Sequence, residues 1–444
     1  MAEVKRSSQG RSDILAIGFA MVVAMWASGY ISRLLPGIHS AVVFFIMIGI
    51  LLAGGWASGR YSGRGAAGGL MSGLLAGIVN LLVLGSVVGN EHVEGVPSIA
   101  VWGPLSIIAH GLICMLGALA GKAGYSSSRT PCNWTGIFAI TAATATYILL
   151  FAGGILTSER AGIAVPDWPN SFGTNMFLFP LERMTGGIYY EHAHRLLGTL
   201  VGLISIFLAV HLALVDKRRV VKVLGFTVLL MVIVQGIFGG KRVELNDLTL
   251  AFVHGSFAQA VLATFVAIAA LVSTTWKSAV EPIAARGAAS DKLLTRILVG
   301  ALLVQITLGS LIRHIDMQTH LHITLAVLIV GYAFFLGIRI ANRYEGQPLL
   351  ALLGNGLVGI VVLQLLLGFW ALVGRGVAAK AGQLYSATHT EIAADPPTIY
   401  VLSASIHQIV GASLLAWAVL TALWCNRLLR QDSSAPPDEQ PVAQ

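Results

Sequence analysis

The sequence predicts an all-α polytopic membrane protein, and three observations lead to this fold class. Of the 444 residues, 56% are hydrophobic and 11% are charged, and the mean hydropathy is +0.80. Apolar stretches of about 18 residues or more, each long enough to cross a bilayer, recur along the chain. These stretches are continuously apolar and do not alternate, which excludes the pattern of a transmembrane β-barrel.

We expect about twelve transmembrane helices, arranged as four followed by eight. The start, "MAEVKRSSQGRSD", is basic and polar and has no convincing cleavage site, so we expect the first apolar run to be a retained span. The spans are expected at about residues 14–35, 40–58, 67–89, 99–121, 135–156, 188–214, 220–238, 249–273, 293–312, 318–338, 348–372 and 399–424.

The charged residues of the loops predict the orientation of these helices. Lys and Arg gather in loops such as "GRYSGRG", "DKRRVVK" and "RIANR", on the side that also holds the N-terminus. The positive-inside rule then predicts a bacterial-type inner-membrane protein with both termini in the cytoplasm. The net charge of +8 reflects this bias, and we expect no nucleic-acid binding. Two long outer loops, about 157–187 and 373–398, have a length that is uncommon unless a loop is functional.

A weak internal repeat divides the last eight helices into two halves. "VQGIFGG", "VQITLGS" and "LQLLLGF" each place a Gln four residues before a Gly, and the next helix carries an embedded histidine. By itself this pattern is typical of close helix packing. We expect an N-terminal four-helix segment and then two four-helix bundles related by a pseudo-twofold axis along the membrane normal. The domains are predicted at 1–125, 130–275 and 290–428, followed by a disordered tail at 429–444.

Four histidines lie within the outer halves of alternate helices, and they are the candidate ligands: His194, His254, His322 and His407. Ionisable residues inside a membrane indicate function by default. Imidazole is a ligand of haem iron, and a helical bundle can hold a porphyrin between facing helices. Zinc usually takes three or four close ligands, and a proton relay is a third interpretation. His320 lies two residues before His322 and remains an alternative ligand.

The stretch "YEHAHR" adds charged residues where an apolar helix begins. Glu191 and His194 are three residues apart and share one face of the helix, so the carboxylate could relay protons beside a bound haem. Alternatively, Glu191 is only a carboxylate near the positive end of the helix dipole. Arg195 could pair with a haem propionate or reach the membrane interface. His192 points away from His194, and we expect it on an outer face of the helix.

These residues together resemble the haem A synthase family. "EHAHR" matches the Glu-x-x-His-Arg motif of that family, "AVPDWPNSFG" is similar to its first outer loop, and "QGIFGG" with His254 fits its third and fourth helices. The resemblance covers about residues 135–425. It implies two four-helix bundles, with substrate haem O held by His194 and His254, and a haem b cofactor held by His322 and His407.

The resemblance also implies a reaction, in which the C8 methyl group of haem O is oxidised to the formyl group of haem A for cytochrome c oxidase maturation. Glu191 would be the catalytic carboxylate. The expected partners are the lipid bilayer, a quinol or other electron donor, haem O synthase, oxidase-assembly factors and a second copy of the chain. The alternative is a non-catalytic dihaem b-type electron carrier in the membrane, which needs the histidines but not Glu191.

The sequence departs from the family pattern in three places. The loop at 157–187 contains no cysteine, whereas some members carry a cysteine pair there. Ile323 follows His322 where the family often has Arg, so the propionate partner in that half is open. The segment 1–125 is an addition of unknown role, and its embedded His110 is expected to be structural because no second histidine matches its depth.

Overall fold

The computed structural model describes residues 12–35, 37–88, 99–126, 131–278, 281–344, 346–380 and 396–432. Within this part of the chain, 84% of the structure is helical, and twelve helices are long and apolar enough to span a membrane. The predicted fold class is therefore confirmed, and the protein is an integral membrane protein. The only sheets among the described residues are two short strand pairs.

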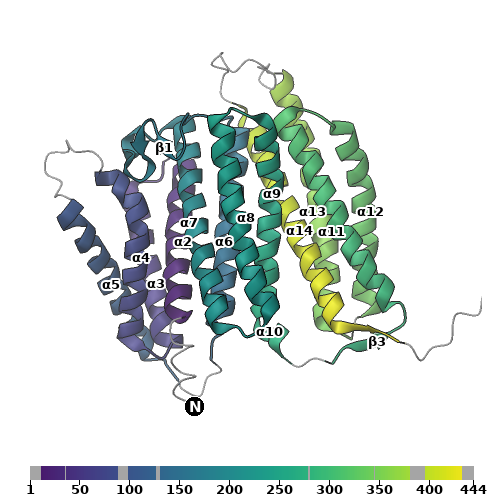
Figure 1. Ribbon diagram of the computed structural model, residues 1–444, viewed down its shortest axis with the longest axis horizontal. Coiled ribbons are helices and arrows are strands. Elements are labelled where there is room, and N and C mark those ends of the chain that lie inside the picture. Colours follow the sequence, from purple (N-terminus) through teal and green to yellow (C-terminus); the bar gives the residue numbers. More distant parts are fainter. Residues whose placement is uncertain are drawn as a thin grey trace, which may run out of the picture. The chain divides into compact units, whose positions relative to one another are not determined.

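The chain forms two compact units, and Figure 1 shows their helices. The first unit comprises residues 1–250 and 268–274, and the second comprises 251–267 and 275–444. Helix α9 (Leu248–Val272) contributes to both units. The predicted division into three membrane domains related by a pseudo-twofold axis stays a prediction.

The first unit contains seven complete spans among the described residues: α2 (Ser12–Leu34), α3 (Ser40–Tyr61), α4 (Gly65–Val88), α5 (Ile99–Lys122), α6 (Trp134–Ser158), α7 (Gly186–Val215) and α8 (Arg219–Glu244). Helix α2 packs against α3, α4 and α6, and so joins the N-terminal segment to the helices that follow. Helices α3 and α5 approach so closely that a Cβ atom at Gly55 would lie 1.9 Å from the backbone oxygen of Cys114. The abundance of glycine in this segment thus allows close helix packing.

A buried polar network connects three helices of the N-terminal segment. The indole of Trp26 on α2 donates to Oδ1 of Asn80 on α4 at 2.9 Å, and Nδ2 of Asn80 lies 3.0 Å from Nε2 of His110 on α5. The other ring nitrogen of His110 lies 2.8 Å from the backbone oxygen of Ser106. Both ring nitrogens of His110 therefore have protein partners, which fits the structural role expected for this residue.

The outer loop between α6 and α7 has its own short elements, namely β1 (Asn170–Ser171), β2 (Thr174–Asn175), η1 (Met176–Leu178) and η2 (Leu181–Arg183). The strands pair antiparallel, with Asn170 opposite Asn175 and Ser171 opposite Thr174. The short helix η1 packs against α4. The loop is therefore a folded element of the first unit.

The second unit contains a ring of four long helices: α11 (Ala288–Ile315), α12 (Thr319–Arg343), α13 (Pro348–Lys380) and α14 (Thr398–Leu428). Helices α11 and α13 each pack against both α12 and α14. Their apolar faces form one core that includes Leu298, Leu302, Leu336, Ile340, Leu357 and Leu415. A short helix α10 (Thr274–Lys277) precedes this ring in the chain.

Polar contacts hold together the end of this ring at which α11 begins and α14 ends. Strand β3 (Ile283–Ala285) pairs parallel with β4 (Leu429–Gln431), so the first three residues of the expected tail form a strand. The rest of that tail, residues 433–444, lies outside the described residues. The fully buried carboxylate of Asp291 accepts hydrogen bonds from Nε of Arg339 at 2.6 Å and from the Tyr344 hydroxyl at 2.7 Å.

Candidate functional site

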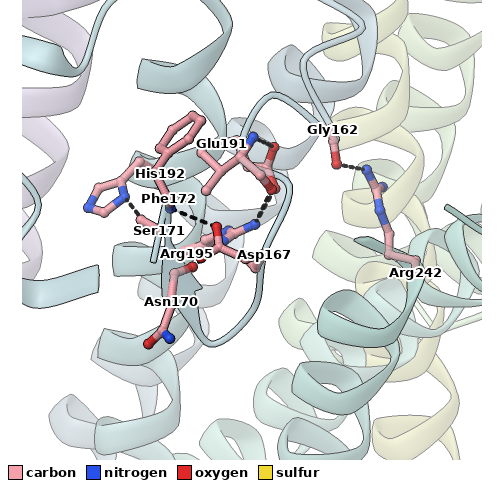
Figure 2. Close-up of polar contacts among 10 residues, drawn as sticks. Gly162, Asp167, Asn170, Ser171, Phe172, Glu191, His192, Arg195 and Arg242 are labelled. Carbon is pink, nitrogen blue, oxygen red and sulfur yellow. Dashed lines mark hydrogen bonds and ion pairs between the residues drawn. The ribbon is translucent and has the colours of Figure 1, made fainter. Parts of the chain in front are cut away.

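The guanidinium of Arg195 on α7 is the centre of the contacts that hold the outer loop, as Figure 2 shows. Its Nη1 donates to the backbone oxygens of Asp167 at 2.7 Å and Asn170 at 2.9 Å. Its Nη2 donates to the backbone oxygen of Val165 at 2.8 Å and to Oε1 of Glu191 at 2.6 Å. The Arg195 side chain is only 8% exposed, so these contacts replace water around a charged group.

Both carboxylate oxygens of Glu191 also have protein partners. Oε1 accepts from Arg195, and Oε2 accepts from the backbone N–H of Val165 at 2.9 Å. The Glu191 side chain is 3% exposed. One residue pair, placed at i and i+4 on α7, thus binds the loop segment 165–170 to the start of the helix. The contacts fix the orientation of the carboxylate.

A second carboxylate shapes the tip of the loop hairpin. Asp167 accepts hydrogen bonds from the backbone N–H groups of Phe172 and Gly173, both at 2.7 Å. These two residues have φ values of 53° and 75°, as a two-residue hairpin turn of the primed type requires. Partial burial acts to raise the pKa of Asp167, but these hydrogen bonds and the nearby Arg195 charge outweigh it and lower the pKa below its ordinary value of 3.8.

His192 lies under this loop, and the expectation that it occupies an outer face is wrong. Its side chain is fully buried, and Nδ1 lies 3.2 Å from the hydroxyl of Ser171. The ring also packs against Phe179, with ring centroids 5.2 Å apart. The sequence could not reveal this, because the loop that covers His192 folds back from a neighbouring segment.

The loop also rests on the outer end of α8. Arg242 donates a hydrogen bond to the backbone oxygen of Gly162, and Figure 2 shows this contact beside the Arg195 cluster. A Cβ atom at Gly240 would lie 2.3 Å from the ring of Trp168, so only glycine leaves room for this indole. The "GG" of "QGIFGG" therefore has a packing role at the loop.

His194 lies one turn beyond Glu191 on α7, facing α6. A Cβ atom at Gly153 of α6 would lie 2.9 Å from Cε1 of His194. The small residue therefore makes room for the imidazole between the two helices. His254 lies on the part of α9 that belongs to the second unit, so the pairing of His194 with His254 stays a prediction.

The second unit brings two of the candidate ligands together. The ring centroids of His322 on α12 and His407 on α14 are 6.4 Å apart, with their planes at 78°. A metal–imidazole bond is about 2 Å long, so two nitrogens on one metal lie about 4 Å apart and the ring centres lie somewhat further. The spacing of this pair therefore fits two axial ligands of one iron. His320 is exposed, and the geometry favours His322 as the ligand.

Glycine and glutamine residues of the neighbouring helices surround this histidine pair. A Cβ atom at Gly309 would lie 3.1 Å from Cε1 of His322, and one at Gly368 would lie 3.3 Å from Cε1 of His407. Nδ1 of His407 is buried and has no hydrogen-bond partner among the described residues. A buried ring nitrogen without a partner, next to glycines that leave space around the imidazoles, is consistent with a bound group between the rings.

The described part of the chain contains no group of three or more His, Cys, Asp or Glu side chains that could hold a metal ion. Structural zinc sites use four such ligands, and catalytic zinc sites use three. The two-histidine arrangement is instead of the kind that haem iron accepts, because the porphyrin supplies the remaining ligands.

The comparisons with known proteins find one family to which part of the chain is similar. Residues 136–322 match the model of the COX15-CtaA family, which is described as cytochrome oxidase assembly protein. The match includes Glu191, His194, His254 and His322, and it ends before His407. No curated protein and no solved structure matches the chain.

The candidate histidines were predictable from the sequence, but most of the hydrogen bonds of the loop at 157–187 were not. The ligand candidates stand out because ionisable residues are rare in apolar helices. The roles of Asp167, Ser171 and Arg242 depend on where the loop folds, which no spacing in the sequence reveals. A usable signal was the Pro-Asp-Trp-Pro stretch, since two prolines and an aspartate indicate an ordered turn.

Proposed function

We propose that this protein is a haem A synthase, which oxidises the C8 methyl group of haem O to a formyl group in the membrane during cytochrome c oxidase maturation. The observation that carries the proposal is the family match over a region that holds Glu191 and His194 one turn apart. The first half of the repeat would hold substrate haem O through His194 and His254. The second half would hold haem b through His322 and His407.

The histidine pair of the second unit supports the cofactor part of the proposal. The two imidazoles face one another from α12 and α14 inside the helix ring, at a spacing that suits one shared iron. When bound, haem b would supply one-electron transfer. The chain itself holds the two ligands at fixed positions, and its apolar core excludes water from around them.

The contacts of Glu191 indicate how the chain could act on the substrate. Conversion of a methyl to a formyl group removes electrons from carbon in two hydroxylation steps, and loss of water from the resulting diol leaves the formyl oxygen. Each hydroxylation replaces a C–H bond by a C–OH bond, and with dioxygen as the oxidant, two electrons from the donor and two protons reduce its second oxygen atom to water. The final loss of water from the diol moves a proton from one hydroxyl group to the other, so these steps need a proton acceptor or donor near the carbon atom. The Glu191 carboxylate is such an acceptor, because Val165 and Arg195 hold its two oxygens in place one turn from His194.

The alternative function is a non-catalytic dihaem electron carrier. This function uses the same histidines, and the hydrogen bonds of Glu191 to the loop would then be purely structural. Only the haem A synthase needs a porphyrin that changes chemically, so the product of the reaction distinguishes the two functions.

The membrane location and the partners of the protein follow from the same proposal. We expect a bacterial-type inner membrane with both termini in the cytoplasm, because Lys and Arg gather in the loops on the N-terminal side. The redox partner that we expect is a quinol or other electron donor. Haem O synthase and oxidase-assembly factors are the expected protein partners.

The test is extraction of haems from cells that express the full chain together with a supply of haem O, with separation by chromatography and identification by mass. Haem A or its hydroxylated precursor is expected with the natural chain. Glu191→Gln should keep the haem content and lose the oxidised product, whereas Glu182→Gln, on the loop before α7, should keep both. If the natural chain yields only haem B and unchanged haem O, the electron carrier becomes the better assignment.

A further inference from the structure

Two glutamines of the repeat contact the histidine pair of the second unit directly. Nε2 of Gln305 on α11 donates to the backbone oxygen of His322 at 3.0 Å and lies 3.1 Å from its Nδ1. Nε2 of Gln364 on α13 donates to the backbone oxygen of His407 at 3.1 Å and lies 3.4 Å from its Nε2. Each amide thus reaches both the backbone and the ring of one histidine.

The Gln-x3-Gly pattern explains why these contacts occur twice. Residues four apart lie on the same face of a helix, one turn from each other. The glycine, Gly309 or Gly368, leaves room for the imidazole, and the glutamine one turn earlier reaches the same histidine. In these two copies of the repeat, the glutamine and the glycine together form the contact surface for one histidine of the next helix.

The amide oxygen of each glutamine has no hydrogen-bond partner among the described residues. Both of these atoms, Oε1 of Gln305 and Oε1 of Gln364, are buried. A neutral imidazole that binds a metal through one ring nitrogen carries a proton on the other, and this N–H regularly donates to a neighbouring oxygen. The atom of each glutamine that lies next to the ring is the amide nitrogen, so the hydrogen bond that the structure shows is the one to the backbone oxygen of the histidine.

We propose, on the basis of the function proposed above, that Gln305 and Gln364 are positioning residues for the haem b of the second unit. The amide nitrogen of each donates to the backbone oxygen of its histidine and lies against the imidazole. This contact fixes the position of the ligand and the orientation of its ring. The two glutamines thereby help to retain the haem.

The helix that faces His194 differs at the corresponding position. Gly153 faces His194 as Gly309 faces His322, but the residue four positions earlier is Leu149, which packs in an apolar cluster with Tyr30 and Leu197. This position therefore brings no amide to His194. The third copy of the repeat, Gln235 and Gly239, precedes His254. The expected substrate site would therefore have such a glutamine at one histidine, and the cofactor site has one at both.

The test uses the purified full-length chain with its bound haem and measures the midpoint potential of the b-type absorption band. Gln305→Leu and Gln364→Leu should each shift the potential and speed haem loss to a haem-scavenging protein by about tenfold or more. Gln305→Glu and Gln364→Glu should not restore either value, because a carboxylate has no donor for the backbone oxygen of the histidine. Thr307→Val is the matched control, since this residue on α11 bonds only to the Leu303 oxygen at 2.9 Å.

Electron paramagnetic resonance supplies a second measurement on the same samples. With ring planes at 78°, the natural protein should show the strongly anisotropic low-spin ferric signal of nearly perpendicular imidazoles. The Leu variants should change this signal, and Thr307→Val should not. If a Leu variant does not accumulate, Gln305→Asn and Gln364→Asn, whose shorter amides cannot reach the ring, take its place.

The outcomes separate the two proposals. Leu or Asn variants that match Thr307→Val in potential, haem retention and spectrum would overturn the role of the glutamines. A natural protein that carries no b-type haem would instead overturn the cofactor assignment itself, and with it the proposed function.

Discussion

Replacement of Arg195 by methionine is expected to release the outer loop from the start of α7. Methionine has a similar length but no donors, so the change removes four hydrogen bonds at once. Three backbone oxygens of the loop and the carboxylate of Glu191 then lose their shared partner. Because Glu191 is 3% exposed, its charge would remain in a place that water hardly reaches.

The size of the effect follows from this burial. Removal of one partner of a buried ion pair costs about 3–5 kcal/mol, since the other charge is left uncompensated. A change of 1.4 kcal/mol corresponds to a factor of about ten in an equilibrium constant. Opening of the loop should therefore become about two to three and a half orders of magnitude more frequent, up to the point at which the loop is fully open.

Hydrogen exchange measured by mass spectrometry reports this opening on loop peptides. The N–H groups of Val165, Phe172 and Gly173 should lose protection by the same factor, while peptides of α13 should not change. Arg160→Met is the control, because this arginine of the same loop is exposed. The double variant Glu191→Gln with Arg195→Met should recover part of the protection. Full protection in Arg195→Met alone would refute the role of Arg195 as the centre of the loop contacts.

Three further predictions concern single features of the first unit. Hydrogen bonds to the carboxylate lower the pKa of Asp167 in the folded loop. The loop should therefore keep its stability above pH 3.8 and lose it as the pH falls through the pKa that Asp167 has in the folded state. Hydrogen exchange should detect this loss, and Asp167→Asn should remove the pH dependence. Gly153→Ala should displace the His194 ring, since the added carbon would lie 2.9 Å from it, and should reduce haem A formation while the b-type spectrum persists. His110→Leu should lower the stability of the purified protein by about 1–3 kcal/mol, because the Asn80 amide loses a buried partner. In thermal unfolding experiments, the double variant Asn80→Leu with His110→Leu should recover part of this lost stability.

Much of the fold was predictable because the bilayer imposes simple rules on sequence. Each span must be long and apolar, and its backbone must bond within itself, so hydropathy alone places the twelve helices to within a few residues. The departures are at helix ends, where α13 continues to Lys380 and α11 begins at Ala288. Polar and charged residues occur in these ends, such as Arg375 and Lys380 in α13 and Asp291 and Lys292 in α11, and hydropathy therefore does not record them.

The sequence by itself determined the fold class, the candidate histidines and the Gln-x3-Gly repeat, because each depends on residue type and spacing along one helix. Tertiary structure decided which of these residues meet: His322 and His407 come from helices that are distant in the chain, and the loop that buries His192 and engages Arg195 folds back over α7. Such contacts depend on how separate segments pack together. A linear pattern carries no information on that packing, and the partner of a buried charge is therefore known only from the folded chain.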